Sequence, residues 1–350
     1  MGNYKKFFHG FPSIINSSYS RRLSNIMVTL VYVFLSAYIC LIFLINSNVN
    51  GNHEQTFQDM LDGTAFKPYV YRVLVPALLR CIDFASPHFA ESFTTLQLSK
   101  YFPSFINHYH INADFAYLGL WSVAIFLLSL LIYCRLLYLG GYHIVGLPRT
   151  QAAITPLLGL FMLPPFFREG YIYDLPQLTL FSACLYLMFR QQWRLYFVVF
   201  VLLCLNKETS IIILFAFLAN YVNEHARRKL LIVSLLHLLI YGTIRLLLDQ
   251  MFQDNRGVSM QIHIVDQANV FLERLTFGTF SQLITALFII TYGWVIKPIF
   301  LRRSLILAAP LLVLFLVGGS PGEYRVFYEV VYVLTLLIFH SIIAVWQNRM

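Results

Sequence analysis

Ionisable side chains gather in four short clusters along this sequence, each beside an apolar segment. The four clusters are His53-Glu54 with Asp59 and Asp62, Arg168-Glu169 with Asp174, Lys207-Glu208, and Glu323-x-Arg325 with Glu329. A carboxylate can take a proton from a hydroxyl group, while Arg and Lys can hold a phosphate that departs. Carboxylates and fixed cations together therefore predict a transfer reaction from an anionic lipid.

The charged residues near these clusters divide into candidate roles. Arg suits two-bond binding of phosphate, whereas Lys acts as a point charge. The candidate phosphate-binding residues are Arg72, Arg168, Lys207 and Arg325. The carboxylates that accompany them as candidate substrate-binding residues are Glu169, Asp174, Glu208, Glu323 and Glu329. Charges at membrane depth are costly and either pair or serve a substrate, so ion pairs that fasten helix ends are the alternative interpretation.

The composition places these clusters in a membrane protein. Apolar residues make up 59% of the 350 residues and charged residues only 12%, which excludes an ordinary soluble domain. Uncharged blocks such as 26–46 and 304–319 are long enough to cross or nearly cross a hydrocarbon core. These runs lack the alternation of barrel strands. We therefore expect an all-α polytopic transmembrane helical bundle.

The positive-inside rule gives a topology with both termini in the cytoplasm. Short loops with Lys and Arg alternate with outer loops, giving about eight to ten spans in a single membrane domain over 1–350. The expected spans are 26–46, 114–139, 150–167, 175–189, 230–248, 279–296, 304–319 and 326–346. The first outer loop, 47–112, is the longest, and within it 68–85 suits an interfacial helix.

The apolar stretch 195–223 has basic residues at both ends and Lys207-Glu208 in its middle. It is too short for two full spans at 1.5 Å per residue, so we expect a hairpin of short helices with Lys207 and Glu208 at its outward tip. In this topology Glu224 is the only acidic residue on the inner side. Acidic residues barely influence insertion, so their segregation predicts one shared cavity on the outer side.

Other signals limit the chemistry. The five cysteines form no CxxC pair and most lie in apolar runs, which predicts small buried residues rather than metal ligands. We find no P-loop, no HExxH motif and no GxGxxG after a strand, so no cofactor is expected and a divalent metal has no support in the sequence. The net charge of +9 comes from basic residues at span ends, so nucleic acid is not an expected partner.

The layout of a first span, an acidic outer loop and the motif PYVYRVLVP at 68–76 resembles the GT-C superfamily of membrane glycosyltransferases, particularly its poorly characterised bacterial members. The segments FREGYIYDLP, LNKETS and GEYRVFYEV are similar to outer-edge motifs of such proteins. The resemblance implies transfer of a sugar from a polyprenyl-phosphate donor to a glycan or lipid acceptor on the non-cytoplasmic face. It also implies a bacterial inner membrane and cell-envelope polysaccharide biosynthesis.

The resemblance further implies that a carboxylate of the first outer loop is the general base. Glu54 is the first candidate, followed by Asp59 and Asp62. Many members carry adjacent acids in this loop, whereas here Glu54 follows His53 and the two aspartates stand apart. Asp59 and Asp62 would share one face of a helix, and capping or a solvated helix face is an equal alternative for them.

Two other functions fit the same features. A polysaccharide polymerase or ligase of the O-antigen kind would also use outer cations and lipid-linked glycans, but such proteins commonly have their larger outer loop late in the chain. A lipid-linked glycan transporter or flippase would place its site near the midplane on broken helices. The acids here collect at the outer edge, which favours the transferase.

Overall fold

The structure is a computed structural model. It describes residues 18–46, 56–86, 88–101, 103–104, 116–167, 170–223, 227–258, 262–265, 269, 277–319 and 323–348. Apart from an isolated bridge between Lys67 and Gly257, the regular secondary structure of these residues is helical, which confirms the all-α expectation. Five helices are long and apolar enough to cross a membrane, so the chain is a multi-pass membrane protein. These five are Ile26–Asn46, Ala116–His143, Arg227–Met251, Ile299–Gly318 and Tyr324–Trp346.

The helices of the first half of the chain lead from a long N-terminal helix to the bundle centre. They are α1 (Ser18–Asn46), α2 (Phe57–Asp62), η2 (Tyr69–Tyr71), α3 (Leu74–Ala85), α4 (His88–Tyr101), α6 (Ala116–His143), α7 (Arg149–Ala152), α8 (Thr155–Phe161), η4 (Pro164–Phe166) and α9 (Asp174–Phe189). The expected interfacial helix 68–85 thus begins with a separate short turn, η2, and α3 starts only at Leu74.

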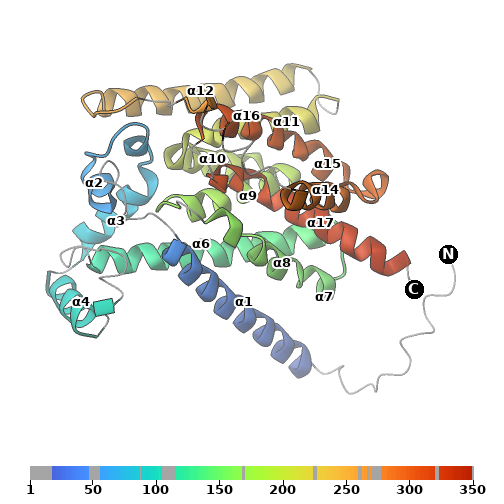
Figure 1. Ribbon diagram of the computed structural model, residues 1–350, viewed down its shortest axis with the longest axis horizontal. Coiled ribbons are helices and arrows are strands. Elements are labelled where there is room, and N and C mark those ends of the chain that lie inside the picture. The colour runs from blue at the N-terminus through green and yellow to red at the C-terminus, as the bar shows by residue number, and fades with distance from the viewer. Residues whose placement is uncertain are drawn as a thin grey trace.

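The helices of the second half of the chain complete the bundle. They are α10 (Trp193–Asn206), η5 (Glu208–Ile212), α11 (Ile213–Tyr221), α12 (Arg227–Met251), α14 (Phe277–Thr291), η6 (Trp294–Ile296), α15 (Ile299–Ser304), η7 (Leu305–Leu307), α16 (Ala308–Gly318), η8 (Tyr324–Phe327) and α17 (Tyr328–Asn348). Figure 1 shows α12 along one side of the bundle and α1 along the opposite side.

Helix α9 forms the centre of the bundle. It packs against α6, α10 and α17, and nearly all of its residues are buried. A helix that is apolar on all sides is typical of such a central position. Its 16 residues span about 24 Å, less than a hydrocarbon core, and the surrounding helices shield it from lipid. Its first residue, Asp174, is fully buried, so the start of α9 brings a charge into the protein interior.

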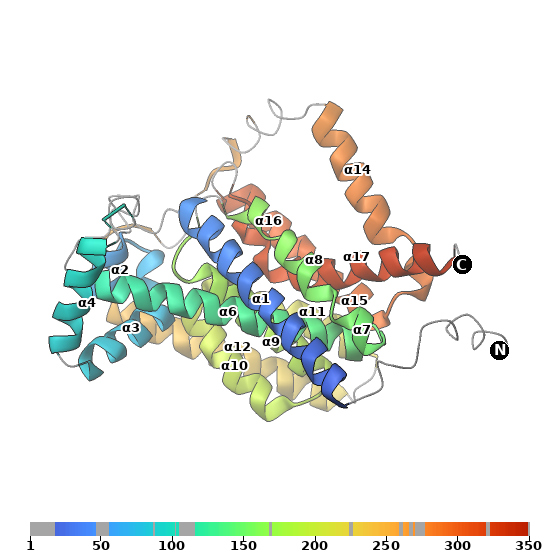
Figure 2. The same ribbon diagram turned by 90° about the horizontal axis from the view of Figure 1, so that it is seen from below.

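Apolar side chains cover the outer surface where lipid is expected. On α12 the residues Leu231, Leu239 and Leu246 are exposed, and on α1 the side chain of Phe34 is 72% exposed. Helix α14 leads away from the body of the bundle in Figure 2 and packs against α17, with Phe288 exposed along it. Exposed apolar surface of this extent marks a lipid or protein contact.

Two expected spans differ from the observed helices. The span 150–167 is divided into α7, α8 and η4, because Pro156 lies in the first turn of α8 and Pro164 starts η4. Proline lacks the backbone N–H that a continuing helix needs, yet fits the first turn of a new one. The span 279–296 is also interrupted, since α14 ends at Thr291 and Gly293 takes a left-handed conformation.

The expected hairpin over 195–223 is confirmed. Helix α10 ends at Asn206, Lys207 has an extended backbone, and η5 and α11 run back. The ring of Trp193 at the start of α10 lies 5.8 Å from Phe217 and 5.5 Å from Tyr221 near the end of α11, so the two arms are antiparallel. Lys207 and Glu208 therefore occupy the tip.

The segment that carries η2 is held against the end of α12. The Tyr71 hydroxyl donates to Asp249 Oδ1 at 2.7 Å, and Lys67 Nζ donates to the Gln253 carbonyl at 2.9 Å. The Asn255 amide donates to the carbonyls of Gly63 and Ala65. These bonds join residues nearly two hundred positions apart, and they fix the position of Arg72, which follows η2 directly.

Candidate functional site

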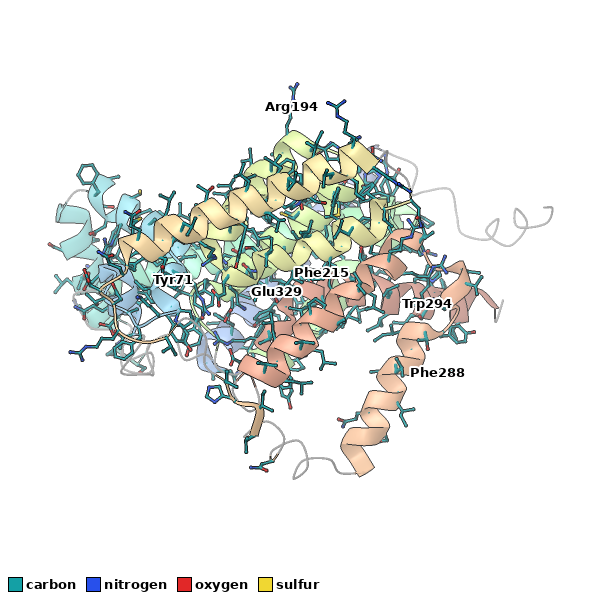
Figure 3. The ribbon with its side chains drawn as sticks, turned by 90° about the horizontal axis from the view of Figure 1, so that it is seen from above. Tyr71, Arg194, Phe215, Phe288, Trp294 and Glu329 are labelled. Carbon is teal, nitrogen blue, oxygen red and sulfur yellow. The ribbon has the colours of Figure 1, made fainter. Side chains whose placement is uncertain are left out.

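Seven of the residues predicted from the sequence meet at one end of the bundle. They come from the end of η2, the start of α9, the tip of the α10–α11 hairpin and the start of η8 and α17. We call them the ionic cluster, and its members are Arg72, Asp174, Lys207, Glu208, Glu323, Arg325 and Glu329. Figure 3 shows Glu329 inside the bundle, whereas Arg194 projects from its surface.

Arg72 and Glu208 form the best-aligned pair of the ionic cluster. Arg72 Nε lies 3.1 Å from Glu208 Oε2, and Nη2 lies 2.5 Å from Oε1, so the guanidinium binds both carboxylate oxygens. The guanidinium carbon of Arg72 also lies 4.8 Å from the Tyr69 ring centre and 4.3 Å from the Tyr173 ring centre. Burial alone lowers the pKa of Arg72, but the charge and hydrogen bond of Glu208 outweigh it and raise the pKa above its ordinary value.

Arg325 links two carboxylates and a tyrosine. Its Nη2 lies 2.6 Å from Glu323 Oε1, and its Nη1 lies 3.4 Å from Asp174 Oδ2. The same Nη1 donates to the Tyr173 hydroxyl at 2.9 Å, an oxygen that also accepts a hydrogen bond from Arg72. The guanidinium carbon lies 4.2 Å from the Tyr171 ring centre. Tyrosine rings and carboxylates thus surround both arginines.

Lys207 lies between two buried carboxylates. Its Nζ is 3.8 Å from Asp174 Oδ1 and 3.7 Å from Glu329 Oε1, and both carboxylate side chains are 0% exposed. Asp174 Oδ2 accepts the Tyr171 backbone N–H at 2.8 Å. Within the described parts of the chain, Asp174 Oδ1 and Glu329 Oε2 have no hydrogen-bond partner. Buried polar atoms without a partner are rare and costly, so this point of the site calls for a ligand or a functional explanation.

Two neutral side chains orient Glu329. Gln177 Nε2 donates to Glu329 Oε1 at 3.2 Å, and the Thr209 hydroxyl donates to the same oxygen at 2.5 Å. The Asn206 amide in turn donates to Gln177 Oε1 at 3.0 Å and to the Tyr173 carbonyl at 2.9 Å. This network connects α9, the hairpin tip and α17, and it holds the Glu329 carboxylate in one orientation.

The remaining predicted residues divide into two groups. In the described structure, Asp59 and Asp62 form no hydrogen bond or ion pair with the ionic cluster. Asp59 Oδ2 accepts the Thr56 N–H at 3.2 Å while Thr56 Oγ1 accepts the Asp59 N–H at 3.1 Å, which is a capping box at the start of α2. Asp62 is exposed and lies 3.9 Å from Arg80. Three predicted residues lie outside the described residues, namely Glu54, Arg168 and Glu169.

Sequence reasoning missed several residues of the site. Tyr69, Tyr171 and Tyr173 stack around the two arginines, with the Tyr171 and Tyr173 rings 5.6 Å apart and nearly parallel. Arg245, on α12, is a further cation: its Nη2 donates to the Cys204 carbonyl at 2.7 Å, whereas its buried Nε and Nη1 have no hydrogen-bond partner in the described structure. An arginine inside an apolar span was itself a signal that could have found it.

The far end of the bundle carries basic residues. Arg190 and Arg194 flank the turn between α9 and α10, and Arg227 begins α12. Arg303 Nη1 donates to the Asn220 carbonyl at 2.9 Å, which joins α15 to the end of α11. Each of these residues lies at the opposite helix end from the ionic cluster. The chain is therefore polarised along its helix axes, with buried carboxylates at one end and basic residues at the other.

The expected buried thiols are confirmed for four cysteines. Cys40, Cys134, Cys184 and Cys204 are buried and free, while Cys81 is exposed and free. Within the described residues, no three His, Cys, Asp or Glu side chains are placed to share a metal ion.

Comparison with family models, curated proteins and solved structures found no match to this chain. The fold and the site define a multi-pass α-helical membrane protein with a buried mixed-charge cluster at one end of its bundle.

Proposed function

We propose that this protein is a membrane glycosyltransferase that moves a sugar from a polyprenyl-phosphate donor to a glycan or lipid acceptor. The reaction takes place at the bundle end that holds the ionic cluster, which we assign to the non-cytoplasmic face of a bacterial inner membrane. The ionic cluster is the observation that carries the proposal. Segments more than 150 residues apart in the sequence bring buried carboxylates and cations to one place, the combination that glycosyl transfer from a phosphate leaving group uses.

Stability alone does not account for this arrangement. Moving a charged side chain from water into the protein interior costs on the order of several kcal/mol. An ion pair offsets this cost only when its geometry is good and its remaining hydrogen bonds are satisfied. Arg72 and Glu208 have such geometry, whereas Lys207 stands 3.7 Å and 3.8 Å from its two carboxylates. A pair of free carboxylate oxygens beside a loosely held ammonium supports a role in binding a substrate.

The aromatic rings support a sugar substrate. The Tyr69 and Tyr171 rings lie 5.3 Å apart beside both arginines, and Tyr69 is partly exposed. A tyrosine offers an apolar face and a hydroxyl at its tip, which suits a sugar ring with its alternating C–H and O–H groups.

Arg245 is the strongest additional candidate for the donor phosphate. Arg72 and Arg325 are each occupied by carboxylates, so phosphate would compete with these carboxylates for them. Arg245 has two N–H-bearing nitrogens without a hydrogen-bond partner in the described structure, and it lies in an apolar helix that a lipid donor would contact. A guanidinium with two such nitrogens suits a phosphate, which can accept hydrogen bonds from both.

A transporter is the second candidate, because the α10–η5–α11 hairpin places the ionisable Lys207 at a break between short apolar helices. Broken helices with charged tips are typical of transporter sites. The two functions differ in their product: a transferase makes a new glycoside, whereas a transporter moves an unchanged glycan.

The test uses the purified full chain in lipid nanodiscs with a panel of polyprenyl-phosphate hexoses and extracted bacterial lipids and glycans as acceptors. We expect release of polyprenyl phosphate and a glycosylated product by mass spectrometry, and neither in empty nanodiscs. In parallel, the protein in sealed vesicles is assayed for movement of a labelled lipid-linked glycan. Flux without any glycosidic product would contradict the transferase and support the transporter.

A further inference from the structure

The centre of the ionic cluster has hydrogen-bonding capacity that the protein does not use. Lys207 Nζ is 3.8 Å from Asp174 Oδ1 and 3.7 Å from Glu329 Oε1, both beyond the roughly 2.7–3.2 Å of an N–H···O hydrogen bond. In the described structure Asp174 Oδ1 and Glu329 Oε2 have no hydrogen-bond partner, although both side chains are fully buried. A donor and two acceptors therefore face one another without bonding directly.

The types of these atoms select a neutral hydroxyl as their ligand. A hydroxyl group has one hydrogen to donate and two lone pairs to accept with. It can donate to a free carboxylate oxygen and accept from Lys207 at the same time. An anion would meet the charges of Asp174 and Glu329, and a metal cation would meet those of Lys207 and Arg325. A sugar or lipid alcohol meets neither repulsion.

The two carboxylates differ in their surroundings. Asp174 lies 3.4 Å from Arg325 and 3.8 Å from Lys207, so two cations hold its charge. Glu329 has Lys207 at 3.7 Å and otherwise accepts hydrogen bonds from the neutral Gln177 and Thr209, both at Oε1. Its Oε2 is left free in the described structure. Glu329 is therefore oriented by neutral donors and free at one oxygen, which suits it to take a proton.

We propose, building on the proposed transferase function, that Lys207 and Glu329 bind the acceptor hydroxyl, that Glu329 is its general base, and that Asp174 positions the Lys207 ammonium. The hydroxyl O–H bond breaks and its proton passes to Glu329 Oε2, while the oxygen forms a bond to the anomeric carbon of the donor sugar. The bond between that carbon and the donor phosphate oxygen breaks, and its electron pair leaves with the polyprenyl phosphate. Lys207 donates to the hydroxyl oxygen and so orients it, and Asp174 holds the Lys207 ammonium in place.

The test compares the wild type with Glu329→Gln in the nanodisc assay. Glutamine keeps the size and can still accept from Thr209, but it cannot take a proton. Loss of a general base typically lowers the rate roughly a hundred- to ten-thousand-fold, so we expect that loss in transfer. Crosslinking to a photoreactive polyprenyl-phosphate analogue should be unchanged. Added formate should partly restore the transfer activity of Glu329→Ala. The control variant Asp83→Asn, which changes an exposed carboxylate on α3, should transfer sugar at the wild-type rate.

Each outcome separates this inference from the proposed function. A wild type that forms no product with any donor overturns the proposed function together with this inference. A wild type that transfers beside an equally active Glu329→Gln overturns the inference alone. If Glu329→Gln does not fold, as judged by thermal unfolding, the variants Lys207→Met and Asp174→Asn test the hydroxyl site instead. A raised acceptor KM with an unchanged donor KM supports the hydroxyl site, and an unchanged acceptor KM in both variants overturns it.

Discussion

Arg72 and Glu208 are 136 residues apart in the sequence and form a two-bond ion pair that fastens the end of η2 to the tip of the α10–α11 hairpin. The arginine side chain is only 6% exposed, whereas the glutamate side chain is 32% exposed. Together with the hydrogen bonds from Tyr71 to Asp249 and from Lys67 to the Gln253 carbonyl, this pair fixes where the segment after α2 meets the bundle core. It therefore joins the first outer loop of the expected topology to the charged centre of the protein.

Breaking this pair should destabilise the protein. Arg72→Met leaves the Glu208 carboxylate, whose side chain is 32% exposed, without its partner, so the thermal unfolding temperature should fall. The loss should be smaller than the roughly 3–5 kcal/mol typical of a fully buried pair, because water still reaches Glu208. The double variant Arg72→Met with Glu208→Gln should recover part of that loss. Arg80→Met is the matched control, because Arg80 lies 3.9 Å from Asp62 at an exposed site. Equal unfolding temperatures for Arg72→Met and Arg80→Met would contradict a structural role for the Arg72–Glu208 pair.

Replacing Arg245 should weaken donor binding. A hydrogen bond to a charged group is typically worth about 1.5–3 kcal/mol, so Arg245→Gln should raise the donor KM roughly tenfold to a hundredfold. The acceptor KM should stay unchanged. Lys229→Gln, at the opposite end of α12, serves as the control cation on the same helix. If both variants keep the wild-type donor KM, Arg245 has no part in holding the phosphate.

Single substitutions can show whether the general base is a first-loop carboxylate or Glu329. Because Asp59 caps α2 and Asp62 faces solvent, we expect Asp59→Asn and Asp62→Asn to retain turnover per folded molecule. Asp59→Asn should lower stability by less than the roughly 0.5–2 kcal/mol of a lost N-cap, because the Asn amide oxygen can still accept the Thr56 N–H. We expect Glu54→Gln to be active as well. An inactive but folded Glu54→Gln beside an active Glu329→Gln would return the general base to the first loop, as the GT-C resemblance implies.

The expected topology has its own test. Reporter fusions after Asn52, Gly170 and Gly322 should indicate the outer side of the membrane, and fusions after Arg194, Lys229 and Arg303 should indicate the cytoplasm. Activity of paired periplasmic and cytoplasmic reporters gives the measurement. A cytoplasmic signal at Gly322 would move the ionic cluster to the inner side and exclude a donor presented outside.

The sequence predicted much of this site because its signals are chemical and local. Acids at span ends and the interrupted stretch at Lys207 were visible in one dimension, and three of the four clusters meet as expected. The pairing of Arg72 with Glu208 could not be predicted from the sequence, since it depends on how distant helices pack. The spacing of Thr56 and Asp59 was a readable capping signal. The roles of Tyr69, Tyr171 and Tyr173 could not be predicted, because in an aromatic-rich chain a tyrosine does not by itself indicate stacking on arginine.

Helices α9 and α17 both begin at the ionic cluster and run away from it. The amino-terminal end of a helix carries about half a unit of positive charge from its aligned peptide dipoles. The ionic cluster contains four carboxylates but three side-chain cations, and the two helix ends together supply about the missing positive charge. Peptide N–H groups do not ionise near neutral pH and cannot swing away like a lysine side chain. Backbone thus provides a permanent counter-charge to Asp174 and Glu329, one that persists unchanged when Lys207 turns toward an incoming ligand.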